Sequence, residues 1–255
     1  MKAVAVIPAR MGSSRFPGKP LADIHGVSMI GHCYLRTAMC EQLLGTYVAT
    51  CDEEIMKHVH SLGGNAVMTA RSHERASDRT AEALIAIEKD LGCKVDVVVM
   101  VQGDEPMVTP EMISLALAPF NSNPDINVVN LMSKIKSIDE FEDPNEVKVV
   151  VDKNSDAIYF SREPIPSRKK GSDSVAMLKQ VCIIPFKRDY LVTFNEMEET
   201  ELERVESIDM LRVIENGGKV RMVYCTQQSF SVDNQADLEK VIREMEHDKL
   251  RLLYL

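Results

Sequence analysis

The 255-residue sequence predicts an α/β fold: a doubly wound, mostly parallel sheet with an inserted antiparallel hairpin region. Short, continuous apolar runs such as "AVAVI" and "VVVMV" are typical of parallel strands that are buried on both faces. Helical patterns alternate with these runs in the first half of the chain, which indicates right-handed β-α-β crossovers. Near residue 143 the pattern changes to two alternating strands around a polar turn, which indicates an antiparallel hairpin.

Each element of the first half has its own signal. Amphipathic spacing predicts a helix within residues 27–44, and two glycines end a second helix within residues 53–64. A third helix is expected over residues 77–92, with Ser77 or Asp78 as its N-cap. The strands expected between these helices cover residues 2–10, 45–52, 65–70 and 95–101.

The second half contains the hairpin, expected over residues 146–166, and a charged stretch, 167–174, that is typical of a loop. No linker or repeat divides the sequence, so we expect one domain over residues 1–255. An insertion at about 143–190 would serve substrate binding and dimerisation. The remaining expected elements are a strand in 179–187, a helix in 205–218, a strand in 220–226 and a terminal helix in 233–246, capped by Asp233 or Asn234.

Composition limits the classes of function. The 39 acidic and 30 basic residues give a net charge of −9, whereas a general nucleic-acid binder would be basic. Six cysteines without a C-x-x-C pair are typical of reduced thiols in a cytosolic protein. No apolar run approaches the roughly 20 residues of a membrane span, and no signal peptide precedes the first strand. We therefore expect a cytoplasmic protein that binds neither nucleic acid nor membranes.

The turn after the first strand, "PARMGSSRFPGKPL" in residues 8–21, is a candidate phosphate-binding loop, here called the phosphate loop. It lacks the Walker A pattern, because Pro20 follows Lys19, and it lacks the G-x-G-x-x-G fingerprint. One interpretation is an exposed connecting loop. The other is a different triphosphate-binding loop, in which backbone amides face an anion and Arg10, Arg15 and Lys19 add cations. Its candidate nucleotide-binding residues are Pro8, Ala9, Arg10, Gly12, Ser13 and Lys19.

A carboxylate is expected close to this loop. The stretch "VQGDEP" places Asp104 just beyond the carboxyl end of the expected central strand, where open α/β sheets bind ligands. A carboxylate repels a triphosphate unless a hard cation lies between them, and Mg²⁺ binds both carboxylate and phosphate oxygens. The second ligand is expected to be Asp233 in "SVDNQ", although aspartate at that point is equally typical of a helix N-cap.

Five segments in chain order carry a family resemblance: "PARMGSSRFPGKPLADIHGVSMIGH", "VQGDEPMVTPEMI", "DPNEVKVVVDKNSDAIYFSREPIPS", "VESIDMLRVIENG" and "SVDNQADLEKV". Together they resemble the signature motifs of the 3-deoxy-manno-octulosonate (KDO) cytidylyltransferases, over about residues 3–243. The resemblance implies a Rossmann-like nucleotidyltransferase fold. It also implies that Asp104 and Asp233 are the Mg²⁺ ligands.

The activity that the resemblance implies is Mg²⁺-dependent transfer of CMP from CTP to the anomeric hydroxyl of an acidic 2-keto-3-deoxy sugar. Pyrophosphate is released, and the product serves lipopolysaccharide synthesis. Direct displacement depends on positioning and charge neutralisation, so no covalent enzyme intermediate is expected. Arg10 and Lys19 would hold the phosphates and, with Asp104, are the expected catalytic residues. Ser77 and Arg79 lie where the family has its cytosine-side motif.

Four residues are the expected ligands of the sugar acid. The planar guanidinium of Arg162 suits its carboxylate, the alternative being a solvated arginine at a strand end. Gln102 offers amide contacts to the sugar hydroxyls. Glu206 falls at a matching family position, with an ordinary surface glutamate as the alternative. Gln180 is the fourth expected ligand.

Two departures from the family pattern concern the acceptor. Gln180 and Cys182 stand where the family usually has histidine and glycine, and Arg75 and Ala76 stand where Ser-Gly is common. Gln180 can replace a neutral histidine in hydrogen bonding but cannot titrate. The acceptor therefore stays open among KDO, a modified octulosonate, a nonulosonate and a phosphonate, and a non-catalytic nucleotide-binding homologue is a further alternative. The partners expected are CTP, the acidic sugar and a second copy of the chain, which would pair through the hairpin region.

Overall fold

The computed structural model describes residues 1–12, 16–169 and 176–254. Ser13, Arg15 and most of the expected 167–174 loop lie outside these residues. The chain divides into two compact units, the first formed by Met1–Ser114 with Ser229–Leu255 and the second by Leu115–Gln228. The expected insertion at 143–190 lies inside the second unit, and the expectation of a single domain stays a prediction.

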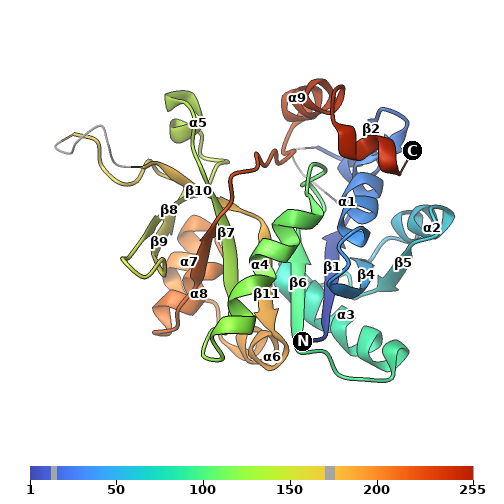
Figure 1. Cartoon of the computed structure of the whole chain (residues 1–255), viewed down its shortest axis with the longest axis horizontal. Helices are drawn as coiled ribbons and strands as arrows, with labels where there is room; N and C mark the ends of the chain where they lie inside the picture. The colour runs from blue at the N-terminus through green and yellow to red at the C-terminus, as the bar shows by residue number, and fades with distance from the viewer. Residues whose placement is uncertain (13–15, 170–175, 255) are drawn as a thin grey trace. The chain divides into compact units, whose positions relative to one another are not determined.

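The first unit contains a parallel sheet with the strand order β6-β1-β4-β5 (Figure 1). The strands β1 and β6 are buried along nearly their whole length, as the apolar runs predict. The parallel α/β fold class is therefore confirmed. The bounds of the strands are Ala3–Ala9 for β1, Leu43–Thr50 for β4, Asn65–Met68 for β5 and Val97–Val101 for β6.

The order of these strands creates a reversal point beside β1. The chain runs outward from β1 to β4 and β5 through helices α1 and α2, and α3 then returns it to β6 on the other side of β1. Right-handed crossovers in opposite directions put helices on both faces of the sheet and open a crevice where the direction reverses. The carboxyl ends of β1 and β6 border that crevice. The helices are Met29–Ala38 (α1), Glu53–Ser61 (α2) and Ala76–Leu91 (α3).

The ends of the helices follow from local chemistry, with one correction. The Ser28 hydroxyl caps α1 by accepting a hydrogen bond from the Gly31 amide, and Gly92 ends α3 in the left-handed conformation. The N-cap of α3 is Arg75, so the expectation of Ser77 or Asp78 is wrong. Ser77 is the second residue of α3, so it lies inside the helix and not at the capping position, and its side chain is fully buried.

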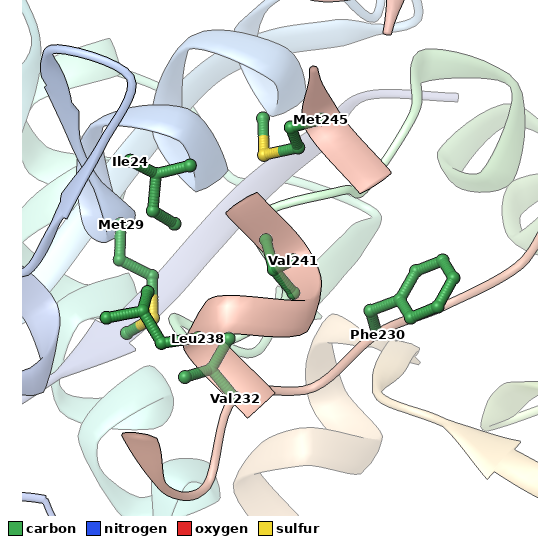
Figure 2. Close-up of a cluster of buried hydrophobic side chains, with 7 residues drawn as sticks. All are labelled: Ile24, Met29, Phe230, Val232, Leu238, Val241 and Met245. Carbon is green, nitrogen blue, oxygen red and sulfur yellow. The ribbon is translucent and has the colours of Figure 1, made fainter. Parts of the chain in front are cut away.

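The phosphate loop ends in the short helix η1 (Lys19–Leu21). Two short strands, β2 (Asp23–Ile24) and β3 (Val27–Ser28), then lead to α1. The chain returns to the first unit at Ser229, and α9 (Gln235–Met245) and η2 (Lys249–Leu253) follow. Figure 2 shows the buried apolar cluster that holds this returning segment against the start of α1. Its members are Ile24, Met29, Phe230, Val232, Leu238, Val241 and Met245.

The second unit contains a mixed sheet with the order β12-β7-β10-β8-β9. The predicted hairpin is confirmed, because β8 and β9 pair antiparallel across the turn at Asp152–Asp156. The single strand expected over residues 179–187 is instead two strands that are interrupted at Cys182. The strands of this sheet are Val129–Lys134 (β7), Lys148–Val151 (β8), Ala157–Ser161 (β9), Leu178–Val181 (β10) and Arg221–Tyr224 (β12). The strand β11 (Ile183–Lys187) follows Cys182 and is not part of this sheet.

The helix expected over residues 205–218 is also divided. Ser207 adopts the left-handed conformation, with φ 55°, and ends α7 before α8 begins. Among the residues described here, no helix is both long and apolar enough to cross a membrane. The remaining helices are α4 (Pro110–Ser122), α5 (Ile138–Glu142), α6 (Arg188–Glu196), α7 (Glu201–Glu206) and α8 (Met210–Glu215).

Candidate active site

A pocket of about 300 Å³ opens in the first unit at the carboxyl ends of β1 and β6. The sheet topology predicts a ligand site at this reversal of strand order. Ser77 does not line the pocket, because its side chain is fully buried within α3, and Ser13 lies outside the described residues. The predicted residues that line it are Pro8, Ala9, Arg10, Gly12, Lys19, Arg79, Gln102 and Asp104.

Close backbone approach shapes the floor of this pocket. A Cβ atom placed on Gly103 would lie 2.8 Å from the carbonyl oxygen of Pro8 and 3.2 Å from the Ile30 side chain. Such a contact with backbone is too short for any residue larger than glycine. Gly103 therefore lets the segment after β6 lie directly against the end of β1, which brings Asp104 to the phosphate loop.

Lys19 joins Asp104 and Asp233. Its ammonium donates to Asp104 Oδ2 at 2.7 Å and to the Val232 carbonyl at 2.7 Å, and it lies 4.0 Å from Asp233 Oδ1. One cation thus contacts both members of the acidic pair, defined here as Asp104 and Asp233. Two carboxylates that share one cation are also the hard oxygen ligands that a divalent ion takes. The donor set therefore fits a small divalent cation.

Contacts between the two acidic segments explain why residues so distant in sequence meet. The Val232 amide donates to the Asp104 carbonyl at 3.0 Å, and the Ser229 hydroxyl donates to the Glu105 carboxylate. Glu105 and Ser229 are both buried. Burial of Val232 in the apolar cluster of Figure 2 holds the same segment in place. Packing and paired hydrogen bonds therefore bring the acidic pair together.

Asp233 is not the N-cap of α9, which was the alternative role expected from the sequence. The N-cap of α9 is Asn234, whose side chain accepts from the Asp237 amide, while Asp237 accepts from the amides of Asp233 and Asn234. This reciprocal arrangement is a capping box. The Asp233 carboxylate lies instead beside Lys19.

Arg79 supports the wall of the pocket from within. It is 3% exposed, and its guanidinium donates to the Thr69 hydroxyl and to the carbonyls of Ala70 and His73. From the same helix, Glu82 accepts from the Ala70 amide and contacts His73. These contacts fix the loop between β5 and α3, which contributes residues 73–75 to the pocket, next to Ala76 at the start of α3. Sequence reasoning missed His73 and Glu74 as lining residues.

In the second unit, two of the predicted substrate residues lie together. The Glu206 carboxylate accepts from the Ser161 hydroxyl at 2.8 Å and from the Arg162 amide at 2.8 Å. The Arg162 guanidinium in turn donates to the carbonyls of Glu206 and Pro144. Arg162 is therefore not a solvated arginine, and Glu206 is not an ordinary surface glutamate. Both order the break between α7 and α8.

Gln180 lies on β10 and is not part of this arrangement. Its side-chain amide donates to Asn130 Oδ1 at 2.5 Å, and its backbone amide donates to the Val147 carbonyl. Asn130 is fully buried and donates in turn to the Val181 carbonyl. The Gln180 amide thus belongs to a hydrogen-bonded pair between β10 and β7, which fixes its orientation.

The environment of Glu206 predicts a pH effect on stability. Partial burial acts to raise its pKa, but hydrogen bonds from Arg162, Ser161 and Tyr159 and the Arg162 charge outweigh it and lower the pKa below its ordinary value. The stabilisation is then complete above the ordinary pKa and is lost as the pH falls below it. Between about pH 5 and about pH 3, unfolding free energy should fall less steeply in Glu206→Gln than in the wild type. Urea titrations at each pH measure both slopes.

The exposed Glu201, on the same helix, gives the matched control. Glu201→Gln removes one carboxylate of the second unit without touching Arg162. If Glu206→Gln and Glu201→Gln have the same acid dependence, the contacts to Arg162 and Ser161 do not influence stability.

Comparisons with known proteins identify the family of the chain. A family model described as cytidylyltransferase matches residues 4–241. A 3-deoxy-manno-octulosonate cytidylyltransferase of Geobacter metallireducens is 41% identical over 255 residues, covering 96% of this chain and 98% of the relative. The protein of the same name from Fusobacterium nucleatum is 38% identical over 252 residues, covering 99% and 100%.

Solved structures give the same result. The structure of a CMP:2-keto-3-deoxy-manno-octonic acid synthetase in complex with CTP matches with a TM-score of 0.87 at 38% identity, covering 96% of this chain and 98% of that one. A 4-diphosphocytidyl-2C-methyl-D-erythritol synthase from Anaerococcus prevotii matches with a TM-score of 0.64 at 16% identity, which shows a shared fold alone. The sequence resemblance is thereby confirmed, and the chain belongs to the 3-deoxy-manno-octulosonate cytidylyltransferase family of nucleotidyltransferases.

Proposed function

We propose that this chain transfers CMP from CTP to the anomeric hydroxyl of KDO or a close relative, releasing pyrophosphate. The observation that carries the proposal is the first-unit pocket, where Arg10 and Lys19 of the phosphate loop meet Asp104. The relative solved with CTP, at 38% identity over nearly the whole chain, supports CTP as the nucleotide. The product would enter lipopolysaccharide synthesis in the cytoplasm.

The residues of the pocket have complementary tasks in this reaction. Arg10 and Lys19 would bind the phosphates and stabilise the negative charge that builds on the leaving pyrophosphate. Asp104 and Asp233 would hold Mg²⁺, which, when bound, neutralises charge on oxygens of the reacting phosphate. Gln102, beside Asp104, would orient the sugar through hydrogen bonds from its amide.

The second-unit residues would recognise the acid sugar. Arg162 makes hydrogen bonds to backbone carbonyls through Nε, Nη1 and Nη2, the last of them to Ser207 at 3.4 Å. A planar guanidinium has five N–H donors, so one N–H on each of Nη1 and Nη2 remains. We propose that a sugar carboxylate accepts from the donors of Arg162 that remain, while Glu206 keeps Arg162 in place.

The test is incubation of the wild-type protein with CTP, Mg²⁺ and a panel of acids, with the CMP-sugar detected by mass. The panel contains KDO, an amino-modified octulosonate, a nonulosonate and a phosphonate. Formation of CMP-KDO with a requirement for CTP is the expected result. A product only with another acid would move the assignment to that acceptor. Binding of CTP without turnover of any acid would identify a non-catalytic homologue.

The buried Arg79 predicts an effect on nucleotide binding. Arg79→Lys keeps the positive charge, but a single ammonium cannot reach the Thr69, Ala70 and His73 acceptors in the geometry of the guanidinium. The loop at residues 70–76 would then loosen, and the KM for CTP should rise roughly tenfold, the equivalent of about 1.4 kcal/mol. Steady-state kinetics at saturating sugar acid measure it. The matched control is Arg71→Lys on the exposed part of this loop; equal KM values in the two variants would contradict the prediction.

We also propose a homodimer that forms through the hairpin region. The strand β9 lies at the end of the second-unit sheet among the described strands, and Ile158 on it is 56% exposed. The start of β9 is already bound, because the Ala157 amide donates to the Val220 carbonyl, so the surface that another chain can cover begins at Ile158. Light scattering at micromolar concentration should give twice the 28.6-kDa mass of the chain, and a mass of one chain would refute the dimer.

A further inference from the structure

The starting observation is that Lys19 has a second set of partners. Under the proposed function, its ammonium binds phosphate oxygens in the first-unit pocket, which it lines. In the structure, the same ammonium donates to Asp104 Oδ2 and to the Val232 carbonyl and lies within 4.0 Å of Asp233. Its side chain is only 13% exposed, so these contacts hold it well inside the protein.

The carboxylates that Lys19 contacts are the ones proposed to hold the divalent cation. The side chains of Asp104 and Asp233 are 22% and 17% exposed. A metal ion that binds to them must therefore displace the Lys19 ammonium, and not only water. An ammonium and a divalent cation cannot both contact the same two oxygens closely, because like charges at such distances repel strongly in a medium less polar than water. Lys19 and the metal would therefore compete for binding to the acidic pair.

We propose that Lys19 competes with the divalent cation for the acidic pair, and that the phosphate groups of the nucleotide relieve this competition by drawing the ammonium away. The inference rests on the proposed function for the identity of the ligands. It makes Lys19 a residue that couples uptake of the metal to uptake of the nucleotide, in addition to its task of binding phosphate. The wild-type protein would then bind a divalent ion weakly by itself and firmly with the triphosphate.

The local structure allows this exchange by movement of one side chain. Gly18, with φ 76°, starts the turn of η1, and the buried Pro20 follows Lys19, so the backbone on both sides is fixed. The lysine stem has four rotatable carbons and can change direction without moving that backbone. The Val232 carbonyl, one of its two close partners, is held by the apolar cluster of Figure 2. The exchange thus changes the partners of Lys19 and leaves the surrounding segments in place.

Coupling of this kind is reciprocal. If the triphosphate weakens the Lys19 contact with the acidic pair, removal of the acidic charge must strengthen metal-free binding of the triphosphate through Lys19. Loss of Lys19 must likewise strengthen metal binding without nucleotide. If Lys19 served only as a phosphate ligand, the first gain would not depend on Lys19, and the second would be no larger than the gain from removing another nearby cation.

The first experiment measures binding of Mn²⁺ alone by electron paramagnetic resonance, which counts the free ion. We expect Lys19→Met to bind Mn²⁺ about tenfold more tightly than the wild type, within the usual range of such couplings. Lys19→Gln removes the same charge but keeps a side chain that can donate to the Val232 carbonyl. If Lys19→Met fails to fold, this second variant still tests the proposal. Adding Asp104→Asn to Lys19→Met should abolish the gain.

The matched control is Arg10→Met. Arg10 has the same charge and lines the same pocket, whereas the ammonium of Lys19 lies 2.7 Å from Asp104 and 4.0 Å from Asp233. If Arg10→Met tightens Mn²⁺ binding as much as Lys19→Met, the effect is one of overall charge and the proposal is wrong. Unchanged or weaker Mn²⁺ binding by both Lys19 variants also overturns it. Turnover of CTP by the wild type is a separate measurement, so failure here leaves the proposed function standing.

The second experiment measures CTP binding by calorimetry in the presence of EDTA. Asp104→Asn should strengthen metal-free CTP binding, and the gain should be several-fold larger with Lys19 present than in the Lys19→Met background. An equal gain in both backgrounds would mean that Asp104 merely repels the phosphates, and the proposed relief of competition would be refuted.

Discussion

Asp104→Asn is expected to lower kcat by about 10²–10³-fold, the usual cost of losing one well-placed electrostatic group in an active site. The amide has the shape of the carboxylate but no charge, so it cannot hold a divalent cation beside the triphosphate. The fold should survive the change, because the contact between Asp104 and Val232 that joins the two acidic segments uses the backbone carbonyl. The loss should therefore appear in kcat rather than in the melting temperature.

The control for this prediction is Asp90→Asn, which removes an exposed carboxylate from α3 in the same unit. Initial rates of CMP-sugar formation at saturating CTP compare the two variants, and thermal melts confirm that both are folded. Full activity of Asp104→Asn would show that the acidic pair is not part of the catalytic machinery. It would also remove the basis for assigning Asp233 as a metal ligand.

The fold was predictable wherever local pattern and tertiary packing agree. The buried runs at β1 and β6 are apolar on both faces, so periodicity alone identified them as parallel strands. The hairpin of β8 and β9 was predictable because a polar turn separates two alternating segments. The hydrophobic pattern did not predict the point at which the backbone interrupts a helix. Ser207 takes φ 55° in the middle of an amphipathic run, so one expected helix is two.

The candidate site was predictable to the extent that its residues follow strand ends. Arg10, Lys19 and Asp104 do so, and one pocket unites them. The contact between Glu105 and Ser229 was not predicted, because it joins segments 124 residues apart and Ser229 has no distinguishing local signal. Such residues can be found from sequence only if the fold is already known.

The same limit applies to the supporting charges. Arg79 was assigned to nucleotide binding, yet its guanidinium also holds the loop beside the pocket through three backbone and side-chain acceptors. The sequence does not distinguish an arginine that is buried for structural support from one that binds a ligand. Only the acceptors around them separate the two roles, and we propose that Arg79 and Arg162 combine both.

The largest effect on stability is expected at the buried ion pair of the second unit. Arg212 Nε and Nη2 donate to the two oxygens of Glu203 at 2.7 and 2.6 Å, and the side chains are 3% and 0% exposed. The Arg212 guanidinium also lies 4.5 Å above the Phe194 ring and donates to its carbonyl. Arg212→Met would leave a buried carboxylate without its guanidinium, and this should lower the free energy of unfolding by about 3–5 kcal/mol.

The measurement is denaturant unfolding of Arg212→Met against the wild type, with Glu201→Gln as a control on the exposed side of the same helix as Glu203. The physical cause is separable from lost packing by the double variant Glu203→Leu/Arg212→Met. Replacing both partners removes the buried charge altogether, so the double variant should recover at least half of the lost stability. If the double variant is less stable than Arg212→Met, packing around Phe194 rather than the uncompensated charge dominates. Glu203 and Glu206 lie on the same helix, α7, and the Glu206 carboxylate accepts from the Arg162 amide. Loosening of α7 in Arg212→Met should therefore raise the KM for the acid sugar more than the KM for CTP.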